Sequence, residues 1–157
     1  MFSCQNSESV RIEKNGFSFT CPEGWKIESE DSSEKNFTMT IQKDGLTSSG
    51  TIKIFSINDS IEDMKVLNGL QENFKNTYPY SDLKIDFDSV TTDSFNNLEC
   101  ISSSFEFEWM DDMEHGTRYV FHGKNKTISI LIQEAVKHSE INKSGFEAFE
   151  VSFVVDQ

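Results

Sequence analysis

Apolar and polar residues alternate along most of this chain, and this alternation restricts the fold more than any other feature. Residues 17–21 and 37–41 carry an apolar side chain at every second position, and residues 101–109 repeat the pattern over a longer stretch. Successive side chains of a strand point to opposite faces of a sheet, so each segment is expected to bury one face. The sequence therefore predicts strands with one buried and one solvated face.

Five further segments have strand-like composition and are bounded by turn residues. They are residues 25–27, 51–57, 83–87, 117–122 and 127–133. Segment 51–57 is apolar on both faces, with Ile54 on one and Phe55 on the other. A strand of this kind is expected to be covered on both sides.

Two segments change to the three-to-four-residue spacing of a helix. The first spans residues 60–78, with Asp59 or Ser60 as candidate caps and Pro79 just beyond its end. The second is predicted over residues 140–155. Strands, a helix, more strands and a final helix indicate an α+β fold.

The predicted architecture is a mostly antiparallel sheet flanked by two main helices. Because segment 51–57 needs cover on both sides, we expect these helices on opposite faces of the sheet. Residues 1–15 are mostly polar and are predicted to be a flexible lead-in, followed by a single domain over residues 16–157. Residues 28–35 are acidic and serine-rich, and are predicted to be a loop.

Charge and hydropathy exclude several classes of partner. Asp and Glu number 27 against 14 Lys and Arg, which gives a formal charge of -13. A field of this sign repels phosphate backbones, so nucleic acids and anionic lipid surfaces are not expected partners. No apolar run approaches the roughly 18 residues that a membrane-spanning helix needs.

The three cysteines are Cys4, Cys21 and Cys100. Cys4 follows a small residue and precedes a polar stretch, as the lipidated cysteine of bacterial lipoproteins does, although the basic and apolar segments that precede such a cysteine are not in the sequence. Cys4 is therefore a candidate lipidation site, and an ordinary free cysteine is the alternative. Cys21 and Cys100 are either small buried side chains or, in an oxidising compartment, disulfide partners.

Two ends of the sequence resemble a known family. The segment Phe17–Trp25 is similar to the F-x-x-P-x-G-W opening of PsbP-like proteins, and Phe146, Phe149 and Phe153 are similar to their closing helix. This family includes the PsbP subunit of photosystem II, DcrB-like bacterial lipoproteins and a nuclear-import factor that binds the Ran GTPase. The resemblance covers about residues 15–155.

This resemblance implies an α/β/α sandwich built on an antiparallel sheet, with a role in binding or assembly and no catalysis. It also implies that Pro22 and Gly24 form a turn and that Trp25 packs under the second helix. No ligand-binding residue of the family is matched here, so no cofactor is expected and the expected partner is a protein.

The densest polar cluster runs from Asp111 to His115 and contains three carboxylates and an imidazole. These groups suit a hard or borderline cation, but their spacing is not that of a calcium loop, and a solvated hairpin tip is the favoured interpretation. The sequence carries no recognisable catalytic motif. A Cys100–histidine pair stays open, because such partners meet only in space.

Trp109, Met110 and Met113 flank this acidic cluster. They form either an exposed protein-contact patch or, for Trp109, the continuation of the buried Phe105–Phe107 stripe. The favoured function is a non-enzymatic PsbP-like module for protein binding or assembly, anchored in a bacterial envelope through Cys4. The alternative is a cytosolic chaperone or adaptor of the kind associated with type VI secretion effectors, which requires an exposed apolar groove beside the sheet.

Overall fold

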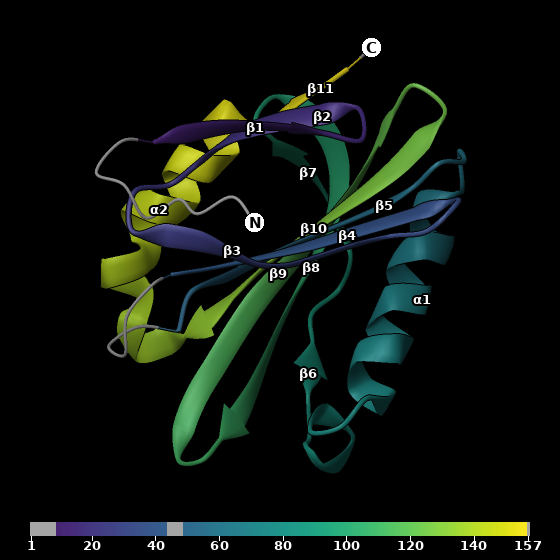
Figure 1. Ribbon diagram of the computed structural model, residues 1–157. Coiled ribbons are helices and arrows are strands. Elements are labelled where there is room, and N and C mark those ends of the chain that lie inside the picture. The colour runs from purple at the N-terminus through teal and green to yellow at the C-terminus, as the bar shows by residue number, and fades with distance from the viewer. Residues whose placement is uncertain (1–8, 44–48, 157) are drawn as a thin grey trace.

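The computed structural model describes residues 9–43 and 49–156. Within them, one large sheet is made of β3 (Trp25–Ser32), β4 (Asn36–Lys43), β5 (Thr51–Ile57), β6 (Asp86–Phe87), β7 (Thr91–Phe95), β8 (Leu98–Trp109), β9 (Asp112–Gly123) and β10 (Lys126–Ala135). The strand order is β3-β4-β5-β10-β9-β8-β6, and β7 pairs with the first half of β8 (Figure 1). Every pairing is antiparallel, which confirms the predicted antiparallel α+β class.

A second, smaller sheet lies above the first in Figure 1 and consists of β1 (Val10–Lys14), β2 (Phe17–Cys21) and β11 (Val154–Val155). The prediction of a flexible lead-in over residues 1–15 is therefore wrong for residues 10–14, while residues 1–8 lie outside the described part of the chain. Backbone pairing with β2 orders this segment, and Ile12 adds a buried side chain to the core.

The two helices are α1 (Asp63–Asn76) and α2 (Ser139–Ser152). Consecutive residues of β9 point to opposite sides of the sheet and join different hydrophobic clusters. Phe121 packs in the cluster that contains Phe149 of α2, whereas Val120 packs in the cluster that contains Leu67 of α1. The larger cluster, on the α2 side, also takes in the buried faces of β1 and β2.

Trp25 packs against α2, as the family resemblance implies. Its ring is 1% exposed and lies 5.3 Å from the ring of Phe146, centroid to centroid. A Cβ atom at Gly145 of α2 would lie 2.4 Å from Nε1 of Trp25, and one at Gly50 would lie 2.5 Å from Cη2. Only glycine leaves room for the indole at these two positions.

Both helices are shorter than predicted. Glu62 precedes α1, neither Asp59 nor Ser60 caps it, and it ends before the Tyr78–Pro79 peptide. The second helix ends at Ser152 because Val154–Val155 pair with β2, as β-branched residues favour. Among the described helices, none combines the length and hydropathy that a membrane span needs.

Three strand predictions need correction. Residues 28–32 were expected to be a loop but form the exposed half of β3, paired with β4. In segment 83–87 only Asp86–Phe87 form a strand. The hairpin turn, expected over residues 111–115, is confined to Met110 and Asp111, whose φ values are 49° and 67°, and β9 begins at Asp112.

Candidate functional site

The β8–β9 hairpin extends beyond both helices at the lower end of the sheet in Figure 1. Its end carries Trp109, Met110 and Met113, which we call the hairpin tip. Their exposed fractions are 37%, 79% and 42%. Trp109 is not part of the cluster in which Phe105 and Phe107 are buried, so the structure does not support a core role for this side chain.

Carboxylates surround the hairpin tip. Glu106 and Glu108 of β8 are exposed, and so is Asp111 in the turn. One of the neighbouring acids is neutralised, because Asp112 forms a 2.8 Å ion pair with Lys137. The register pairs Trp109 with Asp112 and Glu108 with Met113, so Trp109 and Met113 point to opposite faces of the hairpin, with Met110 in the turn between them. The hairpin tip thus carries apolar side chains on both of its faces, with carboxylates beside them.

The structure separates the Asp111–His115 cluster that was considered as a cation site. In a strand, successive side chains point to opposite faces, so Glu114 and His115 cannot converge on one ion. His115 instead bonds Glu134 of β10, with 2.8 Å between Nε2 and Oε2. Across residues 9–43 and 49–156, no group of three or more His, Cys, Asp or Glu side chains could hold a metal ion.

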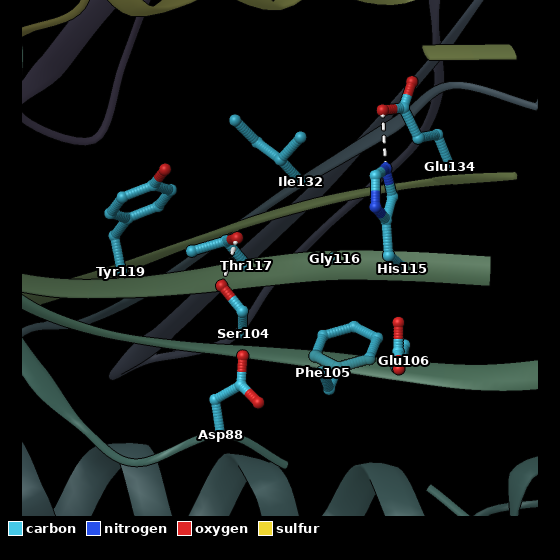
Figure 2. A pocket seen from close by; sticks show the side chains of 10 residues that line it. All are labelled: Asp88, Ser104, Phe105, Glu106, His115, Gly116, Thr117, Tyr119, Ile132 and Glu134. Carbon is cyan, nitrogen blue, oxygen red and sulfur yellow. Dashed lines mark hydrogen bonds and ion pairs between the residues drawn. The ribbon is translucent and has the colours of Figure 1, made fainter. Parts of the chain in front are cut away.

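A polar pocket of about 420 Å³ lies on the face of β8, β9 and β10 that also carries α2 (Figure 2). Its lining residues are Asp88, Ser104, Phe105, Glu106, His115, Gly116, Thr117, Tyr119, Ile132 and Glu134. Most of its polar side chains are acidic or hydroxyl groups. Burial and nearby carboxylates raise the pKa of Tyr119 to about 12, so the phenol stays protonated at neutral pH.

Glu134 organises one end of this pocket. Its carboxylate accepts a hydrogen bond from Nδ2 of Asn142 at 3.0 Å and also meets His115, which joins β9, β10 and α2. Asn142 is fully buried and Glu134 is 7% exposed. Neither residue was recognised from the sequence. The one available signal was that Glu134 continues the register of Ile130 and Ile132 on the buried face of its strand.

The pocket does not assemble a nucleophile with its base. Ser104 Oγ is 2.8 Å from Oγ1 of Thr117, and Figure 2 shows His115 turned away from both, toward Glu134. On the opposite face of β9, burial and Asp112 raise the pKa of Glu114, whose Oε2 is buried without a hydrogen-bond partner in the described chain.

Cys21 is disulfide-bonded, whereas Cys100 is a free, buried thiol. The considered Cys21–Cys100 pairing is therefore wrong. Burial, reinforced by Asp93, raises the pKa of Cys100 to about 12, so it is no nucleophile at neutral pH and the Cys100–histidine hypothesis lacks its thiolate. Cys4, the candidate lipidation site, lies outside the described residues.

No protein-family model matches this chain, and no curated protein sequence matches it. Solved structures do match. The solution structure of the cyanobacterial PsbP protein CyanoP from Synechocystis sp. PCC 6803 superposes with a TM-score of 0.64 at 15% identity, over 96% of this chain and 94% of that one. The chain has the PsbP-like fold.

Two further structures share this PsbP-like fold. LpqN of Mycobacterium tuberculosis, described as involved in cell envelope biogenesis, has a TM-score of 0.56 at 9% identity, over 96% of this chain and 91% of LpqN. A protein from Bacteroides thetaiotaomicron VPI-5482 has a TM-score of 0.57 at 14% identity over 90% of this chain. This chain spans 46% of that longer protein.

Proposed function

We propose that this protein is a non-enzymatic PsbP-like module for protein binding or assembly, and that the hairpin tip is its contact surface. The observation that carries the proposal is the exposure of Trp109, Met110 and Met113 on the two faces and in the turn of a protruding hairpin, where a partner can enclose its end. Tryptophan and methionine are enriched in protein interfaces, and truncating an aromatic anchor there is often strongly destabilising to the complex. Adaptable methionine side chains suit such a surface.

The carboxylates beside the hairpin tip indicate the chemistry of the partner. Glu106, Glu108 and Asp111 add to a chain whose formal charge is -13. Complementary charge speeds encounter and selects partners. The partner is therefore expected to have an apolar groove with lysines or arginines at its edge.

Two observations support a location in a bacterial envelope. A disulfide at Cys21 is typical of proteins outside the reducing cytosol, which counts against the cytosolic chaperone alternative. LpqN, which shares the fold, is described as involved in cell envelope biogenesis. A lipid on Sγ of Cys4 and a disulfide between Cys4 and Cys21 exclude each other, because both use the same sulfur and Cys100 is a free thiol. Peptide mapping of the native protein without reduction decides between them, because it identifies the cysteine joined to Cys21 and any lipid on Cys4.

We also infer that the large sheet and its two helices form an α/β/α sandwich. The assignment of α1 and α2 to clusters on opposite sides of β9 supports this arrangement. In such an arrangement the sheet faces are occupied, and the protruding hairpin is left free to bind.

Photocrosslinking in native cells tests the contact surface. A photoreactive amino acid replaces Met110 in one strain and Val151 of α2 in another. Val151 is a matched control, because it is 71% exposed, close to the 79% of Met110, and lies on a different element. A single defined adduct from position 110 that is absent from position 151 supports the proposal, and the adduct identifies the partner.

Binding to the purified partner then tests the energetics. Trp109→Ala is expected to weaken binding by about 2 kcal/mol, or roughly thirtyfold, as for a hot-spot aromatic. Met64 of α1 is also 37% exposed, so Met64→Ser is the control and is expected to leave the affinity unchanged. Equal affinities for wild type and Trp109→Ala would remove the hairpin tip from the interface.

A further inference from the structure

Arg118 is a buried cation in the middle of the large sheet. It lies on β9 two residues before Val120, so its side chain is on the face covered by α1. Arg118 is 8% exposed. Within the part of the chain that the structure describes, no hydrogen-bond acceptor or carboxylate pairs with its guanidinium.

Such a side chain is unusual, because burying a charge without a partner is strongly unfavourable. A guanidinium carries five N–H donors in a fixed fork that matches a carboxylate or phosphate. Burial lowers the pKa of Arg118 to about 10, which still leaves it charged at neutral pH. An anion supplied from solution would satisfy the donors that the protein leaves unpaired.

A cavity of about 310 Å³ gives such an anion access to Arg118. It lies between α1 and the strands β4 and β5. Lys53, an exposed residue, lies at its mouth, and partial burial, reinforced by the charge of Arg118, lowers the Lys53 pKa. In this acidic chain, none of the residues that line the cavity is an Asp or a Glu.

The rest of the lining is mixed. Phe55, Phe74 and Leu131 contribute apolar surface, whereas Thr40 and Asn73 contribute polar groups. The volume is at the lower end of the range for ligand-binding cavities, about 300–1,000 Å³. It therefore suits a small ligand with one charged group and a short apolar portion.

We propose that this cavity is a binding site for a small amphiphilic anion, whose carboxylate or phosphate pairs with Arg118 and Lys53 while its apolar portion contacts Phe55, Phe74 and Leu131. This site lies on the α1 face of the sheet and involves no residue of the hairpin tip. Its presence or absence is therefore independent of the proposed protein contact.

Backbone-amide NMR titrations with octanoate, octyl phosphate, inorganic phosphate and octanol test the proposal. Octanoate or octyl phosphate is expected to bind with shifts in β5, β9 and α1, and the stronger of the two identifies the head group. Octanol and inorganic phosphate, which each lack one half of the ligand, are expected to bind at least about tenfold more weakly. If octanol binds as tightly as octanoate or octyl phosphate, the charged group has no role in binding. If inorganic phosphate binds as tightly as octyl phosphate, the apolar portion has no role.

Arg118→Met removes the charge and keeps the volume, and it is expected to weaken binding about tenfold or more. Lys53→Met, at the mouth of the cavity, provides a second test with little risk to folding and is expected to have a smaller effect in the same direction. Lys65→Met, an exposed position on α1, is the matched control and should bind as wild type does. Absence of binding at millimolar probe, or undiminished binding in both cavity variants, overturns the site.

Discussion

Replacing Gly145 by alanine tests the packing of α2 against Trp25. A Cβ at position 145 would lie 2.4 Å from Nε1 and 2.6 Å from Cε2 of the indole. The ring is 1% exposed and cannot move into solvent. Gly69 of α1 is a matched control, because both helices have 14 residues and a Cβ at position 69 would meet no atom within 4 Å.

The expected magnitudes follow from two opposing terms. Alanine is about 1 kcal/mol more favourable than glycine inside a helix, and both substitutions gain this term. At Gly69 it is the only term, so Gly69→Ala is expected to raise the free energy of unfolding by about 0.5–1 kcal/mol. At Gly145, overpacking against Trp25 costs about 1–3 kcal/mol and cancels or exceeds the gain. The Gly145 variant should therefore be about 1–3 kcal/mol less stable than the Gly69 variant.

Urea denaturation followed by far-ultraviolet circular dichroism measures this difference. Combining Gly145→Ala with Trp25→Phe adds a further test, since the smaller ring gives space for the new methyl group and should reduce its cost. Equal stabilisation by Gly145→Ala and Gly69→Ala would refute the close contact between α2 and the indole.

Three other variants or reactions test the environments of single residues. Trp109→Ala is expected to lower the free energy of unfolding by about 1 kcal/mol or less, and a loss of ~3–5 kcal/mol in the same urea experiment would mean that Trp109 is a core residue. Cys100 should resist iodoacetamide at pH 8 until the protein is unfolded, because its pKa is about 12 in the fold; mass spectrometry that finds native alkylation would contradict its burial. The raised pKa of Glu114 means that the folded state holds this proton more tightly than the unfolded state, so stability from this group is lost as the pH rises above about 4.3. Glu114→Gln should therefore stabilise the protein at pH 7 more than at pH 3, and the reverse order of the two urea midpoints would refute the shift.

The fold class could be predicted because most strands bury one face. Residues 37–41 and 101–107 alternate clearly, since their apolar side chains face the core clusters. Residues 28–32 could not be recognised, because this half of β3 is exposed and is ordered by backbone pairing with β4, which leaves no trace in the side-chain pattern. The same reason hid residues 10–14, where Ile12 is the one fully buried side chain.

The candidate sites were less predictable because they depend on tertiary contacts. Trp109 has the same strand parity as Phe105 and Phe107, so the alternation alone indicates a core position. The hairpin extends beyond the part of the sheet that α1 covers. Trp109 is therefore exposed because β8 is long, although its place in the alternation is that of a core residue. Arg118 was not recognised, because nothing in the sequence around it shows that α1 covers its face of β9.

Hydrogen exchange of the backbone amides, with and without the crosslinked partner in purified form, is the most direct measurement of the protein-binding role. Protection is expected over residues 108–113 at the hairpin end, with the β9–β10 turn at residues 123–126 unchanged. Protection of that other turn, with residues 108–113 exchanging as in the free protein, would place the interface elsewhere and contradict the proposed contact.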